Sequence, residues 1–145
     1  MGVEEIMREI KFRVWDKITN QYLQELGIYY WHIPYSLDGE KITGEANLVG
    51  LSELLRHDNF VVQQYTGLTD NNDKEIYEGD ILIYKTGSIP TTGVIGQVLY
   101  EADEGGYIFQ WERKGPNQHH INLNCDVAFE SVIVGNIFEH SELLK

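Results

Sequence analysis

Apolar and polar residues alternate in several short segments of this chain, with turn-forming residues between them. Residues 10–14 read Ile-Lys-Phe-Arg-Val, and residues 94–100 alternate almost as regularly. A period of two is typical of a strand with one buried face. In the segment 78–85, residues 81–84 are apolar at both alternating sets of positions, which indicates a strand covered on both sides. These patterns predict strands at residues 10–15, 22–26, 60–65, 80–85, 94–100 and 107–111, with further strand material at 127–138.

Turns and helices are predicted from other signals. Asp38-Gly39 is typical of a hairpin turn, and Pro34 favours an edge position for the aromatic segment 27–35. Residues 66–75 lack apolar periodicity and read as a loop. Leu51, Leu54 and Leu55 have helical spacing, so we expect one short helix at 48–57, and a helical turn at 140–144. Short strands at this turn spacing predict a mainly β fold, a small barrel- or sandwich-like β-meander with one or two short helices.

The domain organisation follows from length and from the absence of repeats. The 145 residues suit one domain with a real hydrophobic core, and 42% of them are apolar, too many for a disordered chain. The acidic start of the sequence does not fit a signal peptide. We expect residues 1–9 to be an N-terminal lead-in and residues 10–145 to form a single β-rich domain.

The charge of the chain bears on its partners. With 23 acidic and 11 basic side chains, the formal net charge is −12, which opposes binding to a phosphate backbone. Lys11 and Arg13 are the best start of a basic patch, and a solvated strand face is the simpler interpretation. An acidic surface could instead attract a basic protein surface. No apolar run approaches 18 residues, so we expect no membrane partner. Cys125 is the single cysteine, which excludes an internal disulfide and suits a reducing cytoplasm.

The sequence contains no complete motif for catalysis or for metal binding. The acidic cluster between Asp70 and Asp80 fails the EF-hand pattern at three positions, leaving an irregular cation site as the alternative. His119 and His120 with Cys125 and Asp126 offer ligand types for zinc, but adjacent residues on a strand point to opposite faces. No nucleophile elbow and no phosphate-binding loop is present. We therefore expect no enzyme, no catalytic residue, no metal and no cofactor; an enzyme of unknown class is the alternative.

Three stretches carry a family resemblance: KFRVWD at 11–16, YTGLTDNNDKEIYEGDIL at 65–82 and VIVGNIFEHSELL at 132–144. In order and spacing they resemble the YopX family of phage and prophage proteins from low-GC Gram-positive bacteria. His140-Ser141 departs from the asparagine-proline that similar sequences often have there. The resemblance implies a β-rich fold, a phage or prophage origin and a place in the cytoplasm of a bacterial host cell. It implies no reaction, because the family has no established activity to transfer.

The central motif also has a physical interpretation. Gly67 and Gly79 suit unusual backbone angles, and Tyr65, Leu68 and Tyr77 suit anchors that hold the loop on a core. As a contact surface for an unknown protein partner, we predict Trp31, Tyr35, Tyr65, Tyr77 and Glu78. The predicted function is an uncharacterised, non-enzymatic phage accessory protein acting through protein contacts, with self-association through edge strands as a parallel expectation. The alternative is a nucleic-acid-associated small-barrel module, which needs a basic groove beside stacked aromatic rings.

Overall fold

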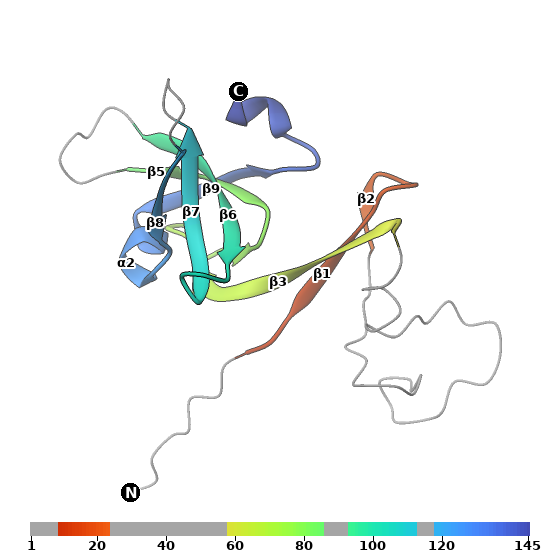
Figure 1. Ribbon diagram of the computed structural model, residues 1–145, viewed down its shortest axis with the longest axis horizontal. Helices are drawn as coiled ribbons and strands as arrows, with labels where there is room; N and C mark the ends of the chain where they lie inside the picture. Colours follow the sequence, from red (N-terminus) through yellow and green to blue (C-terminus); the bar gives the residue numbers. More distant parts are fainter. Residues whose placement is uncertain (1–8, 24–57, 86–92, 113–117) are drawn as a thin grey trace, which may run out of the picture. The chain divides into compact units, whose positions relative to one another are not determined.

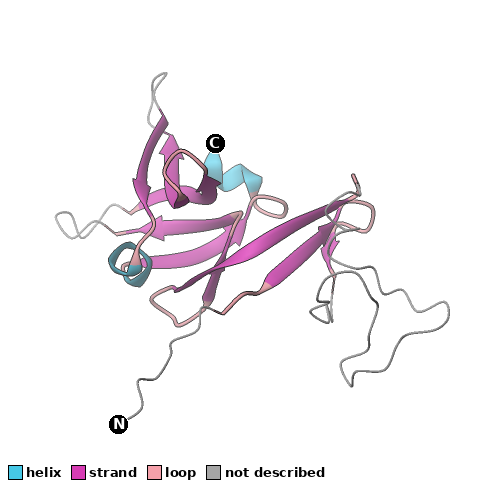
Figure 2. Ribbon diagram, turned by 60° about the horizontal axis from the view of Figure 1, so that its bottom comes forward, coloured by secondary structure: helices cyan, strands magenta, loops and turns pink. Residues whose placement is uncertain are grey.

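A computed structural model describes residues 9–23, 58–85, 93–112 and 118–145 of the protein (Figure 1). The chain divides into two compact units, one of residues 11–64 and one of residues 65–145 with the first ten. Most of the regular structure described is strand, drawn in magenta in Figure 2. The mainly β fold expected from the sequence is therefore confirmed. The division into a lead-in and a single domain stays a prediction.

The unit of residues 11–64 contains an antiparallel ladder of three strands: β1 (Phe12–Asp16), β2 (Gln21–Tyr22) and the first half of β3 (Phe60–Thr69). Val14 lies opposite Val62, and Trp15 opposite Tyr22. Val14 and Trp15 are both buried, so the end of β1 is covered on both faces. The strand expected at residues 10–15 is confirmed with a start two residues later.

The β1–β2 turn is held by a side chain at its start. The Asp16 carboxylate accepts the backbone N–H of Ile18 at 2.8 Å, and Asn20 takes a positive φ of 54°. Asparagine tolerates this left-handed conformation better than most residues. The same hydrogen bond from Ile18 lowers the pKa of Asp16 below its ordinary value, because it favours the charged carboxylate.

The second unit is built around a five-stranded antiparallel sheet in the order β8-β7-β6-β5-β9. Its strands are β5 (Asp80–Tyr84), β6 (Val94–Glu101), β7 (Gly106–Glu112), β8 (Gln118–Asn122) and β9 (Ser131–Asn136). The first four follow one another as neighbours, so the predicted β-meander is confirmed. Gly105, with φ of 66°, closes the β6–β7 turn. A further strand, β4 (Glu75–Tyr77), pairs with the second half of β3.

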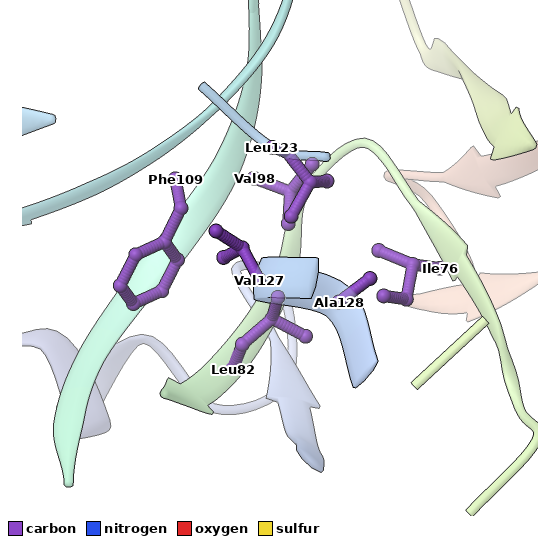
Figure 3. Close-up of a cluster of buried hydrophobic side chains, with 7 residues drawn as sticks. All are labelled: Ile76, Leu82, Val98, Phe109, Leu123, Val127 and Ala128. Carbon is purple, nitrogen blue, oxygen red and sulfur yellow. The ribbon is translucent and has the colours of Figure 1, made fainter. Parts of the chain in front are cut away.

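The core of the second unit gathers side chains from β4, β5, β6, β7 and the segment that follows β8 (Figure 3). Each fully buried aliphatic or aromatic side chain contributes about 1.5–3 kcal/mol relative to exposure. Phe109 is the largest of them, and its ring lies directly over Gly96, where a Cβ would come within 2.8 Å of two ring atoms. The members of the cluster are Ile76, Leu82, Val98, Phe109, Leu123, Val127 and Ala128.

One short helix, α2 (Cys125–Phe129), closes this core. The Asn124 side chain accepts the backbone N–H of Val127 at 2.9 Å and so caps the first turn. Val127 and Ala128 point into the core (Figure 3). The prediction of strand for residues 127–138 was therefore wrong at its start, because burial of two small apolar residues outweighs the β preference of valine. The strand begins only at Ser131.

Two other local predictions need correction or extension. Residues 66–75 are not a loop throughout, because β3 continues to Thr69 and β4 begins at Glu75. Strand β8 was not expected, since its sequence has no apolar alternation; its partner is β7.

The helical turn expected at the end of the chain is confirmed as the 3-10 helix η1 (Ser141–Leu144). Several predictions lie outside the described residues: the end of strand 22–26, segment 27–35, the hairpin turn Asp38-Gly39 and helix 48–57.

Candidate functional site

The segment from Tyr65 to Asp80, which carries the most distinctive motif of the sequence, is held in place by backbone geometry and by side-chain caps. Gly67 and Gly79 adopt φ of 85° and 80°, a region that L-residues rarely occupy. The pairing of β3 with β4 shifts register between Tyr65 and Thr69, so the strand bulges there. The expectation of unusual backbone angles at both glycines is confirmed.

Asp70 is the centre of the loop between β3 and β4. Its side chain is buried, with the residue 3% exposed. One carboxylate oxygen accepts the backbone N–H groups of Asn72 and Lys74, both at 2.9 Å. The other accepts the backbone N–H of Ile133 at 2.9 Å, and Ile133 lies on β9, 63 positions along the chain. Asp70 therefore shapes its own turn and also ties that turn to the edge of the five-stranded sheet.

Asp80 and Thr66 complete the framework on the other side of the loop. The Asp80 carboxylate accepts the backbone N–H of Tyr77 at 2.8 Å, across the turn that contains Gly79. The Thr66 hydroxyl donates to the carbonyl oxygen of Ile76 at 2.8 Å. Asp70 and Asp80 thus direct carboxylate oxygens at backbone donors. In this arrangement the two acids stabilise turns, which is the structural role proposed for such residues in loops.

Two aromatic residues of the motif pack against each other. The Tyr65 and Tyr77 rings lie with centroids 5.5 Å apart, in the range of favourable aromatic pairs. Tyr65 is 6% exposed and is therefore a core residue in this unit, whereas Tyr77 and Glu78 are half-buried. The predicted contact surface can thus draw on Tyr77 and Glu78 but not on the Tyr65 ring. Trp31 and Tyr35 lie outside the described residues.

An exposed aromatic side chain that the sequence analysis missed lies beside this loop. Phe129, the last residue of α2, is 66% exposed. The Asn71 side chain donates to its carbonyl oxygen at 3.0 Å, and the Asn71 backbone N–H donates to Ser131 at 2.8 Å. The loop tip, residues 71–74, is itself exposed. We call Phe129 together with residues 71–74 the Phe129 surface.

The charges around Phe129 are mostly negative. Asp126 precedes it by three positions on the helix and so shares its side, and Glu130 follows it directly; both are exposed. The loop tip adds one acid, Asp73, and one base, Lys74. A sequence signal for Phe129 existed in the Asn124 cap, which marks the start of a helical turn. Assigning the segment to a strand concealed it.

Comparison with known proteins identifies the family. The sequence profile described as YopX protein matches residues 11–145, nearly the whole chain. The chain belongs to the YopX family. Among solved structures, the crystal structure of protein EF1440 from Enterococcus faecalis is similar at 24% identity, covering 96% of this chain and all of that one, with a TM-score of 0.56. That likeness supports the fold. None of the curated proteins compared matches the chain.

The histidine pair of this YopX chain does not converge with its cysteine. The His119 ring stacks on Trp111 with centroids 5.9 Å apart, while His120 lies 3.3 Å from Glu104. Cys125 is exposed on α2. Within residues 9–23, 58–85, 93–112 and 118–145, no group of three or more His, Cys, Asp or Glu side chains is placed to hold a metal ion. Across the same ranges no helix is both long enough and apolar enough to span a membrane.

Arg13, one of the two residues that could begin a basic patch on the N-terminal strand, makes local side-chain contacts. The Arg13 side chain donates from Nε to the Gln63 side-chain oxygen at 2.8 Å, and its guanidinium lies 4.6 Å from the centre of the Tyr22 ring. The Tyr22 hydroxyl donates to the same Gln63 oxygen at 2.9 Å. Trp15, on the same strand, is 4% exposed, so its aromatic ring is not open to stacking on bases. Arg13 is half-buried in these contacts, so this strand face is less solvated than expected, and the contacts do not favour a nucleic-acid groove.

Proposed function

We propose that this YopX chain is a phage or prophage accessory protein without enzymatic activity, which acts by binding another protein. The observation that carries the proposal is the Phe129 surface. A large apolar ring, 66% exposed, is held on a short helix that is fixed at both ends. Exposed aromatic side chains on rigid supports are typical energetic centres of protein interfaces.

The support of the Phe129 surface is held by side-chain hydrogen bonds at both ends of α2. The Asn124 side chain fixes the start of α2 through the N–H of Val127, and Asn71 fixes its end through the carbonyl of Phe129. Because Val127 and Ala128 are buried, the helix cannot rotate without opening the core. Binding through a ring on a pre-ordered backbone loses less conformational entropy than binding through a flexible segment.

The surrounding charge indicates the chemistry of the partner. Asp126 and Glu130 beside the ring add to the overall charge of −12. The proposed partner surface therefore combines an apolar depression with basic residues at its rim. A complementary charge would raise the rate of association more than the final affinity.

Affinity capture with matched variants tests this proposal. The tagged protein, Phe129→Ala and Trp31→Ala/Tyr35→Ala would each be incubated with lysate of a Gram-positive host, and bound proteins quantified by mass spectrometry. We expect Phe129→Ala to reduce recovery of a specific partner by about tenfold or more, as for a central interface residue. The double variant independently tests two of the contact residues predicted from the sequence.

The control variant is Tyr100→Ala, which removes another exposed aromatic side chain, 55% exposed on β6. It should recover the partner as well as the unchanged protein does. A partner that binds the unchanged protein and Phe129→Ala equally would refute the role of the Phe129 surface. Hydrolysis or transfer activity of the purified chain that is lost with a single polar substitution would refute the non-enzymatic proposal.

A further inference from the structure

The five-stranded sheet of the second unit ends in two edge strands, β8 and β9, which differ in how their outer sides are covered. The outer side of β9 is covered by the loop at Asp70. The Ser131 carbonyl accepts the backbone N–H of Asn71 at 2.8 Å, and the Ile133 N–H donates to the Asp70 carboxylate at 2.9 Å. Covering an edge in this way prevents it from pairing with another chain.

The outer side of β8 has no such cover among the elements that the structure describes. Leu123 donates its backbone N–H to the Tyr107 carbonyl at 2.9 Å, so these two opposite residues form a hydrogen-bonded pair of the β7–β8 ladder. Along an antiparallel ladder, hydrogen-bonded pairs alternate with pairs that are not hydrogen-bonded. Ile121 therefore directs its backbone groups at β7, and the backbone groups of His120 and Asn122 point outward from the sheet.

The composition of β8 allows two copies of this acidic chain to pair along this strand without like charges facing each other. Its five residues, Gln-His-His-Ile-Asn, include no acidic residue and no Lys, Arg or Pro, in a chain with net charge −12. Edge strands that must stay single are commonly protected by Lys or Pro. The side chains of His120 and Asn122 are exposed, and the His120 ring lies 3.3 Å from the Glu104 carboxylate.

We propose that β8 pairs with β8 of a second copy of this chain, antiparallel and centred on Ile121. In this register the outward backbone groups of His120 bond those of Asn122 in the second copy, and the reverse pairing follows from the twofold axis. Ile121 meets Ile121 of the second copy at a non-bonded position, where side chains approach most closely. That contact extends the apolar face on which Ile121 already packs. The proposal is independent of the Phe129 surface.

Paired charge variants test both the dimer and its register. In His120→Glu/Asn122→Glu, acids face each other across the new pairing. In His120→Glu/Asn122→Lys, the acid at position 120 faces the ammonium at position 122 of the second copy. Both variants share the His120 change and therefore its effect on Glu104 within one molecule. Sedimentation velocity over a concentration series would give the dissociation constant, and circular dichroism would check folding.

We expect the unchanged protein to dimerise and to dimerise more tightly as salt screens the repulsion of its net charge. The all-acid variant should weaken the dimer about tenfold or more, since two like-charge cross-strand pairs oppose it. The acid–base variant should restore the dimer to the level of the unchanged protein. A monomeric unchanged protein at high concentration, or a dimer insensitive to the all-acid variant, would overturn the proposal. Failure of the acid–base variant to restore it would overturn the register.

Discussion

Asp70 offers the sharpest test of how the central motif of this YopX chain is held. Substituting asparagine keeps the size of the side chain and removes one acceptor. The amide oxygen can still accept from Asn72 and Lys74, but an NH₂ group then faces the Ile133 N–H, donor against donor. A hydrogen bond to a charged group contributes about 1.5–3 kcal/mol, and an unpaired buried donor costs a similar amount. We therefore expect Asp70→Asn to lower the free energy of unfolding by about 2 kcal/mol.

Asp70→Ala removes all three acceptor contacts and should cost more. The Asn72 and Lys74 donors lie on an exposed loop tip, so water replaces part of what they lose. Ile133 is half-buried on β9 and gains less from water. The expected loss is about 4 kcal/mol, an exceptionally large value for a single substitution that the breaking of a buried hydrogen-bond network can reach. Urea unfolding at pH 7, followed by circular dichroism, measures both variants.

A local measurement separates the proposed cause from general destabilisation. Amide hydrogen exchange should show the Ile133 N–H protected in the unchanged protein and exposed first in Asp70→Asn. Asp73→Asn is the matched control in the same loop, because Asp73 is exposed and its φ of 62° suits asparagine equally. We expect the control to stay within about 0.5 kcal/mol of the unchanged protein. An Asp70→Asn protein of unchanged stability with Ile133 still protected would refute the reasoning.

Two further predictions concern single positions elsewhere. The pKa of Asp16 is lowered mainly by the hydrogen bond from the Ile18 N–H, so the ionised carboxylate stabilises the folded state. This contribution is fully present above the pKa of aspartate in the unfolded chain, about 4, and is lost as the pH falls through the lower pKa of the folded state. In Asp16→Asn the melting temperature should therefore fall less steeply between about pH 5 and pH 2 than in the unchanged protein, and an equally steep fall would contradict this. Gly96→Ala would drive a methyl group into the Gln110 carbonyl oxygen and should cost about 1–3 kcal/mol, whereas Gly106→Ala, with open space around it, should not; equal melting temperatures would count against the packing described.

The amino-acid sequence by itself determined three strands of the β-meander, β5, β6 and β7, and the turn that leads into β5. Apolar alternation at residues 94–100 marks a strand because side chains on a strand alternate between faces, a property of the local backbone. Gly79 and Asp80 marked the turn before β5 because this turn is held locally. The Asp80 carboxylate accepts the backbone N–H of Tyr77, only three positions earlier in the chain. The family resemblance likewise rested on local motifs. Each of these features depends on residues that are neighbours in the chain.

Tertiary structure decided where the distant segments meet, and with them the candidate surface. Asp70 reaches Ile133 across 63 positions, and Asn71 reaches Phe129 across 58, distances that no local pattern encodes. Residues 127–129 became helical because Val127 and Ala128 could be buried in the core, which outweighs weak local preference. Strand β8, with no apolar alternation, exists because β7 offers it backbone partners. The covered edge at β9 and the open edge at β8 follow from these long-range contacts.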